Sequence, residues 1–295
     1  MDLVFGGHGF LGGHLCQLLE SYHSPHYREL YLRPDKVYRK APYETTYHLG
    51  AWVGGIGFLR DKPHSIFDRN LDFALKVFFN SKPYISNDEK FFPTKNIIVA
   101  GSVCEYPHAS FMTESMINHG EPTPDTAGYG YAKRAIYNMG RMFEQEHGVR
   151  VLHCILTNLY GPGDKSTHVV AELVRKFCDA KKRGERSVDV WGDGEATRDL
   201  LYVSDAARML KEAGERYYGP AINLATGVET TIRELAETIA WACDYTGKIN
   251  YVKGAPVGEK RRQIDISKAL NCKIKHDVDL DDGIKETVKW YQNSI

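Results

Sequence analysis

Short runs rich in β-branched residues alternate with helical patterns over the first two-thirds of the chain. The runs predict strands at Leu3–Phe5, Glu29–Leu32, Thr45–Leu49, Asn96–Ala100 and Val151–Leu156. The intervening segments predict helices near Phe10–Glu20, Ser65–Phe79 and Ala127–His147. This alternation predicts an α/β protein with a Rossmann-type, doubly wound parallel sheet. The turn-rich segment Ser81–Pro93 is expected to be a surface loop.

The pattern changes after Tyr160, where Gly161-Pro162-Gly163 breaks the chain. Further on, it predicts helices at about Val169–Lys182, Ile232–Cys243 and Asp282–Gln292, and strands at Val188–Trp191, Leu200–Val203 and Ala221–Leu224. Thr230 or Thr231 can cap the second of these helices, with Glu234 as a capping-box partner. We therefore expect one domain of residues 1–160 plus about 199–225, and a smaller C-terminal α/β lobe of 161–198 and 226–295.

Composition excludes several classes of protein. Lys+Arg and Asp+Glu number 38 each, so no overall charge would attract nucleic acid or an anionic membrane. The chain opens on an apolar strand without a basic leader, and its longest uncharged apolar stretch, His48–Leu59, is too short to span a bilayer. Six scattered cysteines without a C-x-x-C pair predict reduced thiols in a cytoplasmic protein, and the His and Cys spacing predicts no metal site.

A glycine-rich turn follows the first predicted strand. Gly6, Gly9 and Gly12 form G-x-x-G-x-x-G, with Phe10 and Leu11 opening a helix. Such glycines make a tight turn, let the backbone approach a pyrophosphate and allow close helix–strand packing. The helix N-terminus can then bind the phosphates of a dinucleotide.

The end of the second predicted strand favours NADP over NAD. Arg33 stands where an acidic residue would bind a free ribose 2′-hydroxyl, and a guanidinium favours a 2′-phosphate instead. An ordinary exposed arginine is the alternative interpretation, and Asp35 nearby weakens the preference.

Tyr129 and Lys133 are the candidate catalytic pair. Among 18 tyrosines, only Tyr129 has a lysine four positions on, so both side chains share one face of a helix. An ammonium beside a phenol is expected to lower the phenol's pKa from about 10. Lys133 can also hold the nicotinamide ribose. Ser102 follows the fourth predicted strand, at the sheet edge where doubly wound sheets bind ligands.

At these residues the chain resembles the extended short-chain dehydrogenase/reductase (NAD-dependent epimerase/dehydratase) family, and within it the GDP-L-fucose synthase branch. The resemblance runs nearly end to end. The segments that carry it are Trp52-Val-Gly-Gly-Ile56, Gly101-Ser-Val-Cys-Glu-Tyr-Pro107, Tyr129-Gly-Tyr-Ala-Lys133, Thr157-Asn-Leu-Tyr-Gly-Pro162, Trp191-Gly-Asp-Gly194, Arg198-Asp-Leu-Leu-Tyr-Val203 and Asn223-Leu-Ala-Thr-Gly-Val228. The Ser-x-Cys pair and His168 narrow the match to the synthase branch.

The resemblance implies two reactions in one site. Cys104 and His168 match the acid/base pair that inverts C3 and C5 of a 4-keto sugar. NADPH then reduces C4, while Tyr129 supplies a proton and Ser102 hydrogen-bonds the oxygen. Without the resemblance, a buried space-filling cysteine and a capping histidine are the better interpretations of Cys104 and His168.

The resemblance also assigns binding residues. Asn158 and Leu159 lie in a cofactor-binding motif of the first domain. Substrate contacts are expected from the C-terminal lobe, through Lys176, Trp191, Arg198 and Arg262. A homodimer formed through the helix of Tyr129 is expected from the family alone.

The chain departs from the family pattern at several places. The span from Arg33 to Thr45 and the loop from Asp164 to His168 are short. Val257 replaces an aspartate that contacts substrate, and His8 replaces an arginine that helps to bind a 2′-phosphate. Because of these departures, a related 4-keto sugar is an alternative substrate.

The expected activity is NADPH-dependent 3,5-epimerisation and 4-keto reduction of a GDP-4-keto-6-deoxy-mannose-type nucleotide sugar, giving GDP-L-fucose or a close relative. The alternative is a 4-reductase or C3/C5 epimerase acting on a different GDP- or dTDP-4-keto sugar, including a heptose. A non-catalytic nucleotide sensor on the same fold is a third hypothesis, against which Tyr129, Lys133 and Ser102 argue.

Overall fold

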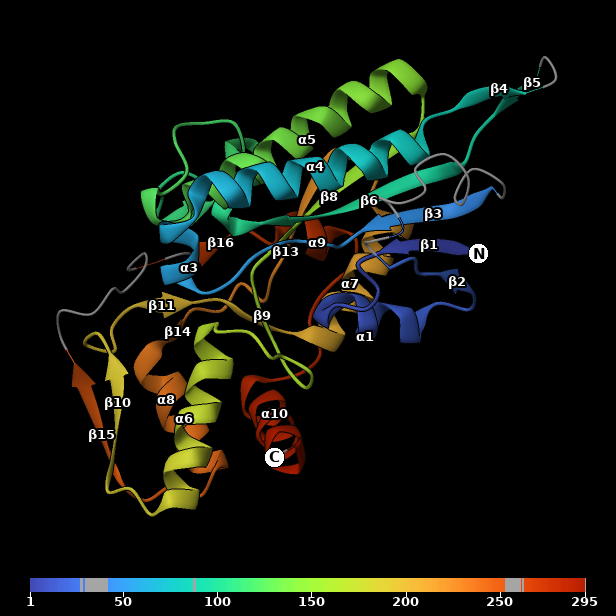
Figure 1. The fold of residues 1–295 in the computed structure, drawn as a ribbon. Helices are drawn as coiled ribbons and strands as arrows, with labels where there is room; N and C mark the ends of the chain where they lie inside the picture. The colour runs from blue at the N-terminus through green and yellow to red at the C-terminus, as the bar shows by residue number, and fades with distance from the viewer. Residues whose placement is uncertain (27–28, 30–41, 87–88, 253–260, 262, 295) are drawn as a thin grey trace.

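A six-stranded parallel sheet forms the centre of the molecule (Figure 1). The structure, a computed structural model, describes residues 1–26, 29, 42–86, 89–252, 261 and 263–294. The sheet has the order β13-β8-β6-β3-β1-β2, with every neighbouring pair parallel. Its strands are β1 (Asp2–Phe5), β2 (Tyr22–His23), β3 (Tyr43–His48), β6 (Thr94–Ser102), β8 (Arg150–Leu156) and β13 (Ala221–Leu224). The Rossmann-type sheet predicted from the sequence is confirmed.

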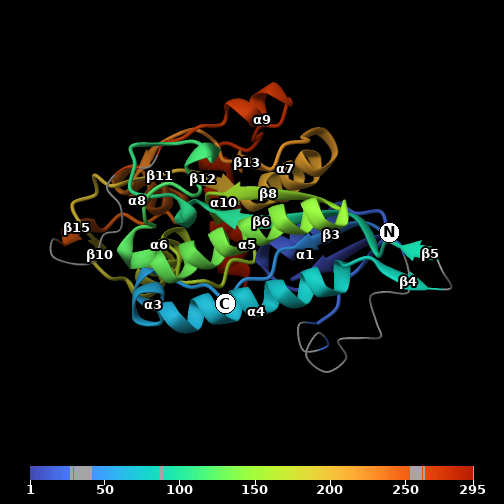
Figure 2. The same ribbon diagram turned by 90° about the horizontal axis from the view of Figure 1, so that it is seen from above.

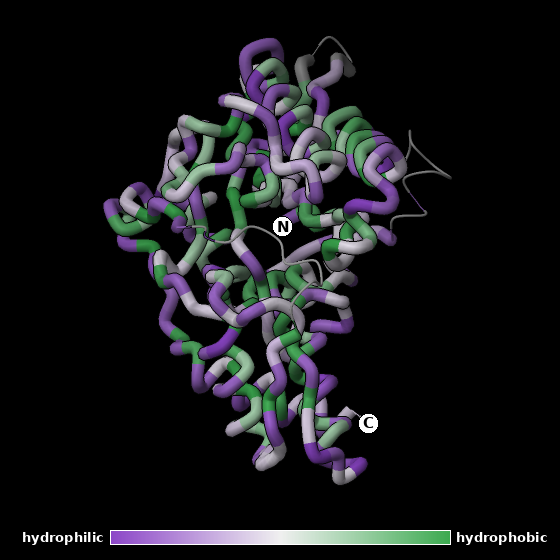
Figure 3. The backbone as a smooth tube through the Cα atoms, turned by 90° about the vertical axis from the view of Figure 1, so that its left-hand side faces the viewer, coloured by the Kyte–Doolittle hydropathy of each residue, from purple (hydrophilic) through white to green (hydrophobic). Residues whose placement is uncertain are grey.

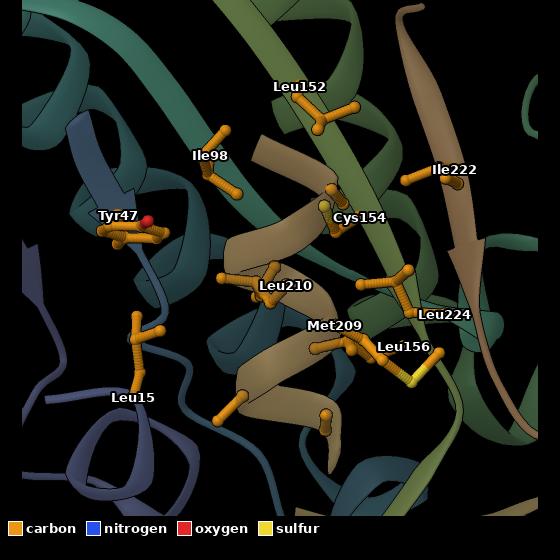
Figure 4. Packing of buried hydrophobic residues seen from close by; sticks show 14 of the residues in the cluster. Leu15, Tyr47, Ile98, Leu152, Cys154, Leu156, Met209, Leu210, Ile222 and Leu224 are labelled. Carbon is orange, nitrogen blue, oxygen red and sulfur yellow. The ribbon is translucent and has the colours of Figure 1, made fainter. Parts of the chain in front are cut away.

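Helices cover both faces of the sheet. On one face α4 (Pro63–Ser81) and α5 (Ala127–His147) run side by side (Figure 2), and on the other lie α1 (Phe10–Leu18) and α7 (Val203–Arg216). Because side chains alternate along a strand, Ile97 packs under α4 and α5, whereas Ile98 packs toward α7 (Figure 4). Burial on both faces explains why these strands are apolar without alternation.

A second lobe packs beneath the carboxyl ends of the strands (Figure 1). Three helices lie on one side of the two-stranded parallel pair β10 (Ser187–Trp191) and β15 (Lys248–Val252). They are α6 (Val169–Arg183), α8 (Ile232–Ala242) and α10 (Leu280–Ser294). Their hydrophobic faces share one buried core that includes Phe177, Leu235 and Ile284.

The remaining elements are short. The antiparallel pairs are β4 (Tyr84–Ser86) with β5 (Glu89–Phe91) and β11 (Thr197–Arg198) with β14 (Thr230–Thr231). The parallel pairs are β7 (Phe111–Met112) with β16 (Gln263–Ile264) and β9 (Asn158–Tyr160) with β12 (Leu200–Tyr202). The short helices are α3 (Ile56–Asp61), α9 (Ser267–Asn271) and the 3-10 turns Val103–Glu105, Glu114–Met116 and Pro124–Thr126.

Most predicted elements are present. Helix α5 has the predicted bounds, and Thr231 caps α8 in a capping box with Glu234. In Figure 3 hydrophobic and hydrophilic stretches alternate along the tube, as expected of elements with one buried face. None of the described helices combines the length and hydrophobicity that crossing a bilayer requires.

One prediction needs correction, one falls outside the described residues, and one helix was not predicted. The expected surface loop Ser81–Pro93 is wrong, because it contains the hairpin of β4 and β5. The rings of Tyr84 and Phe91 pack 5.1 Å apart across this hairpin, which explains why the segment pairs. Helix α7 was not predicted. The predicted strand Glu29–Leu32 lies outside the described residues, apart from Glu29.

Candidate active site

The glycine-rich turn joins β1 to α1 at the carboxyl edge of the sheet. Gly6 has φ +95°, a left-handed conformation that favours glycine, and its carbonyl accepts a hydrogen bond from the Gly9 N–H at 2.9 Å. A Cβ at Gly12 would collide with the Gly6 carbonyl, so only glycine lets the helix approach the turn this closely. With Gly9 as the N-cap, the N–H groups in the first turn of α1 lack helical partners and can bind an anion.

Tyr129 and Lys133 lie buried on the sheet-facing side of α5. Lys133 is 1% exposed and Tyr129 is 8% exposed. The Lys133 Nζ lies 5.5 Å from the Tyr129 ring centroid and donates a hydrogen bond to the Ala100 carbonyl at 2.6 Å. The spacing of four residues therefore brings the amine and the phenol together at the end of β6.

Burial changes the acid–base properties of this pair. The pKa of Tyr129 is raised well above its ordinary value, first by burial and then by the nearby Cys104 and Glu105. This direction is opposite to the one expected from the neighbouring amine. Burial also lowers the pKa of Lys133 to about 8, although Glu105 and Cys104 oppose that shift. The phenol is therefore protonated near neutral pH and still carries a proton that it can donate.

Ser102 ends β6 and begins a 3-10 turn that carries Cys104. The Ser102 Oγ accepts a hydrogen bond from the Cys104 N–H at 3.2 Å, and the Glu105 carboxylate accepts one from the Ser102 N–H at 2.6 Å. Cys104 is half-buried and packs in one cluster with Tyr129 and Trp52. The structure thus brings together Ser102, Cys104 and Tyr129.

His168 reaches this region through a short loop. It is the N-cap residue of α6, and the Ser166 Oγ accepts a hydrogen bond from its N–H at 3.1 Å. The Thr167 Oγ1 accepts one from the Gly55 N–H at 3.0 Å. Gly55 begins α3, whose Phe58 packs in the cluster of Cys104. His168 and Cys104 therefore lie on segments that both contact α3.

The environment of His168 disfavours its charged form. Burial lowers the pKa of His168, and the negative charge of Asp164 opposes this shift only in part. The imidazole can therefore act as a base near neutral pH.

The predicted substrate residues fall at two places in the second lobe. Lys176 on α6 places its Nζ 5.3 Å from the ring centroid of Trp191, which is 56% exposed at the end of β10. An exposed indole beside a cation can stack on a nucleobase. Arg198, on β11, is half-buried and donates a hydrogen bond to the Thr197 carbonyl at 2.6 Å. Arg262, Val257 and Arg33 lie outside the described residues.

Asn158 and Leu159 lie on β9, beside the carboxyl edge of the main sheet. The Asn158 amide donates a hydrogen bond to the Asp199 carbonyl at 3.1 Å, and Leu159 packs against the sheet's core. Asp199 is buried and accepts hydrogen bonds from the N–H groups of Thr226 and Gly227. Burial raises the pKa of Asp199 to about 6. These bonds join the three segments at which the chain passes between the main sheet and the second lobe.

Sequence reasoning missed Glu105 and His153, which form a buried pair behind Ser102. A signal for Glu105 was present, because Ser102-x-x-Glu105 has the spacing of a capping box. His153 offered no such signal, since its position on β8 resembles any buried strand position. Within the described residues, no cluster of three or more His, Cys, Asp or Glu side chains could hold a metal ion.

Comparison with known proteins identifies the family. The sequence profile of the NAD dependent epimerase/dehydratase family matches residues 3–225. The chain belongs to this family. It is 31% identical over 252 residues to GDP-L-fucose synthase 1 of Arabidopsis thaliana, a match that covers 83% of the chain and 76% of the relative. It is 28% identical to GDP-L-fucose synthase of Escherichia coli K12, covering 84% of the chain and 80% of the relative.

A third relative matches a shorter part of the chain at slightly higher sequence identity. Probable GDP-L-fucose synthase 1 of Oryza sativa subsp. japonica is 32% identical over 208 residues, which cover 68% of the chain and 63% of that relative.

Solved structures of this epimerase/dehydratase fold superpose on most of the chain. A GDP-6-OMe-4-keto-L-xylo-heptose reductase from C. jejuni has a TM-score of 0.87 at 20% identity, covering 100% of this chain and 98% of that one. A GDP-L-fucose synthetase from Naegleria fowleri bound to NADP has a TM-score of 0.84 at 24% identity, covering 99% and 92%. At these identities, the superpositions establish the fold.

Proposed function

We propose that the chain is an NADPH-dependent epimerase/reductase. It acts on a GDP-4-keto-6-deoxy-mannose-type nucleotide sugar, inverts C3 and C5, reduces C4, and gives GDP-L-fucose or a close relative. The observation that carries this proposal is the turn of Ser102 and Cys104, which lies against Tyr129 and Lys133 at the carboxyl end of β6. The names of the relatives from Arabidopsis and Escherichia coli support the same substrate.

The glycine turn fits a dinucleotide. A side chain at Gly12 would fill the place where α1 meets the turn, and the N–H groups of the first turn of α1 suit a diphosphate. NADPH, when bound there, supplies the hydride that reduces the ketone. The residues that we assign to cofactor binding are Gly6, Gly9, Phe10, Leu11, Gly12, Arg33, Lys133, Asn158 and Leu159.

Tyr129 and Ser102 complete the reduction. As hydride adds to C4, the electron pair of the carbonyl bond moves to O4, and Tyr129 transfers its phenolic proton to that oxygen. Ser102 donates a hydrogen bond to O4, which stabilises the developing charge. Lys133 lies close enough to Tyr129 to stabilise the phenolate that remains, until solvent returns the proton.

Cys104 and His168 carry out the epimerisations. The 4-keto group acidifies the hydrogens on C3 and C5, so one residue can remove a proton while the other delivers one to the opposite face. Both residues lie on segments that contact α3, which supports pairing them in one site. Both steps leave the oxidation state of the sugar unchanged and must precede the reduction.

The two parts of the chain divide binding between them. We assign cofactor binding to residues 1–160 with about 199–225, and substrate binding to 161–198 and 226–295. The cation–π pair of Lys176 and Trp191 supports a nucleobase site in the second lobe. Arg198 and Arg262 are assigned to the substrate diphosphate.

A second candidate is a 4-reductase or C3/C5 epimerase for a different GDP- or dTDP-4-keto sugar, including a heptose. The short loop from Asp164 to His168 favours this candidate, because the Thr167 hydrogen bond to Gly55 holds His168 close to α3. That restraint can limit which carbon the imidazole reaches.

The face formed by α4 and α5 supports a homodimer. It exposes Leu75, Phe79 and Met142, and a hollow of about 670 Å³ lies between the two helices near Phe67 and Tyr131. Exposed apolar surface of this kind is typical of an interface. We place this dimer in the cytoplasm.

One experiment separates the two candidates. The protein is incubated with GDP-4-keto-6-deoxy-mannose in deuterated water with NADPH or NADH, and the product is analysed by NMR. Deuterium at both C3 and C5, with faster oxidation of NADPH, is expected. Reduction without deuterium at either carbon would leave only the 4-reductase. A panel of other nucleotide-activated keto-sugars would then identify its substrate.

A further inference from the structure

Glu105 and His153 form a fully buried pair behind the active-site turn. Glu105 is 0% exposed and His153 is 2% exposed, and the His153 Nε2 lies 2.9 Å from both carboxylate oxygens. The pair fits only because residue 101 is glycine, since a Cβ there would collide with the His153 imidazole and approach the Glu105 carboxylate.

Glu105 is anchored at both its side chain and its main chain. Its carboxylate accepts a hydrogen bond from the Ser102 N–H at 2.6 Å. Its carbonyl accepts one from the Arg134 Nε at 2.5 Å, and Arg134 directly follows Lys133 on α5. The turn that carries Ser102 and Cys104 is thereby fixed to both β8 and α5.

Charged and titratable groups face this pair from each element packed against it. From α5 these are Tyr129, Lys133, Arg134 and Tyr137, whose ring lies 5.3 Å from that of His153. From β3, His48 faces Lys133 and His153 across Val99, its register partner on β6. Cys104 lies on the turn itself. Burial, Lys133 and His153 together lower the pKa of His48 well below its ordinary value.

A buried carboxylate–imidazole pair is a costly way to stabilise a protein. Removing such groups from water costs free energy that their attraction can fail to recover, and apolar residues of similar volume are often at least as stabilising. The contacts of Glu105 run to Ser102 and to the surroundings of Tyr129 and Lys133, so the benefit lies at the active site.

We propose that Glu105, held by His153, is a positioning residue for the reduction: it fixes the Ser102–Cys104 turn, and its negative charge acts on Lys133 and Tyr129. This inference rests on the proposed function. The charge of Glu105 raises the pKa of both Lys133 and Tyr129, which favours an ammonium beside a protonated phenol. Glu105 itself does not touch the reacting atoms.

Two substitutions separate its geometric role from its charge. Glu105→Gln keeps an oxygen for the Ser102 N–H and for His153 but removes the charge, whereas Glu105→Ala removes both. Glu114→Gln is the matched control, because Glu114 is also a buried carboxylate that accepts a backbone N–H, from Asn223 at 2.9 Å. Thermal melts show whether each variant folds.

Steady-state reduction by the intact protein is measured from pH 6 to 10. For Glu105→Gln we expect kcat within about threefold of the parent below pH 7, with the alkaline limb displaced to lower pH by about one unit. For Glu105→Ala we expect kcat to fall about a hundredfold, because the turn moves. Glu114→Gln should follow the parent. An alkaline limb at the same pH in Glu105→Gln and the parent would overturn the proposal.

A second measurement does not depend on the substrate. Iodoacetamide alkylation of Cys104 is followed by peptide mass spectrometry, with Cys272, also half-buried, as the internal reference. Glu105→Ala should alkylate several-fold faster at Cys104, and Glu105→Gln at the parent's rate. Equal rates in the parent and Glu105→Ala would reject the positioning role. If the parent does not reduce the keto-sugar, the proposed function fails, and the alkylation rates alone decide the role of Glu105.

Discussion

The Lys133 ammonium donates a hydrogen bond to the carbonyl of Ala100, two residues before Ser102, while lying 5.5 Å from the ring centroid of Tyr129. One side chain thus connects the strand that ends in Ser102 to the helix that carries the phenol. The distance between Tyr129 and Ser102, the proton donor and oxyanion donor that we propose, is therefore set by two rigid elements.

Replacing Tyr129 with phenylalanine should remove the proton donor and leave the cavity filled. We expect kcat for 4-keto reduction to fall about 10²- to 10⁴-fold with little change in KM, because the phenol acts mainly in the transition state. Tyr131→Phe, an exposed tyrosine on the same helix, is the control and should behave as the parent. Parental turnover by Tyr129→Phe would reject the mechanism.

The activity should decline as the pH rises through about 8. The pKa of Lys133 is lowered to about 8, so the ammonium is present below that pH and lost above it. Because kcat/KM reports ionisations of the free enzyme, its alkaline limb should lie near pH 8. Lys133→Arg keeps its charge at every accessible pH and should lose this limb, although at lower activity. If the alkaline limb of Lys133→Arg lies at the same pH as that of the parent, the ionisation belongs to another group.

The same pKa has a consequence for stability. The folded value of about 8 lies below the ordinary value of 10.5, so between these values the unfolded chain binds more protons than the folded one. The contribution of Lys133 to the free energy of unfolding should therefore increase as the pH rises from about 8 to 10.5. Urea unfolding of the parent and of Lys133→Met across this range isolates that contribution.

Replacing Cys104 with serine should separate epimerisation from reduction. We expect Cys104→Ser to reduce a ketone that is already epimerised at a rate near that of the parent. The full reaction should be blocked, because each inversion needs one residue to remove a proton and the other to deliver one. Product analysis in deuterated water measures both steps, and Cys272→Ser serves as the control. Equal loss of the two steps would contradict the assigned division.

The hydroxyl of Thr167 should matter for epimerisation more than for reduction. Thr167→Val removes the acceptor for the Gly55 N–H and frees the loop that carries His168. We expect deuterium incorporation to fall about tenfold while reduction of the epimerised ketone stays near the parental rate. Thr167→Ser keeps the acceptor and should retain both activities. If the valine and serine variants incorporate deuterium equally, the loop does not depend on this hydrogen bond.

The apolar face of α4 and α5 should control assembly. A charge at Leu75 or Met142 would be buried in the proposed dimer at a cost of several kcal/mol, so Leu75→Glu and Met142→Glu should be monomers by light scattering. Trp241→Glu, on the exposed surface of α8, should assemble as the parent does. The proposed interface is wrong if Leu75→Glu and Met142→Glu keep the parental mass.

The sequence was most informative where local spacing decides structure. Helix α5 was predicted with its observed bounds, and the capping box of α8 was predicted with Glu234 and either Thr230 or Thr231, of which the structure uses Thr231. The spacing of Tyr129 and Lys133 likewise placed their side chains together. Neighbours along one helix are visible in a sequence because they depend on three or four residues.

Properties that depend on burial were not visible. The spacing of Tyr129 and Lys133 suggested that the amine lowers the phenol's pKa, but desolvation, which depends on the whole fold, raises it. His153 on β8 pairs with Glu105, which follows the neighbouring strand β6 and lies 48 residues earlier in the sequence. The hairpin of β4 and β5 was missed for a different reason. Its strands are short and lie among turn-forming residues, so the segment has the composition of a loop.

The edge strand β13 has a consequence for synthesis. It pairs with β8, but 64 residues separate the end of β8 at Leu156 from Ala221. A ribosome must therefore make α6, β10 and α7 before the open edge of β8 finds its partner. Until then that edge offers unpaired backbone groups to other chains, so the nascent protein is most vulnerable to aggregation while the residues between β8 and β13 are being made.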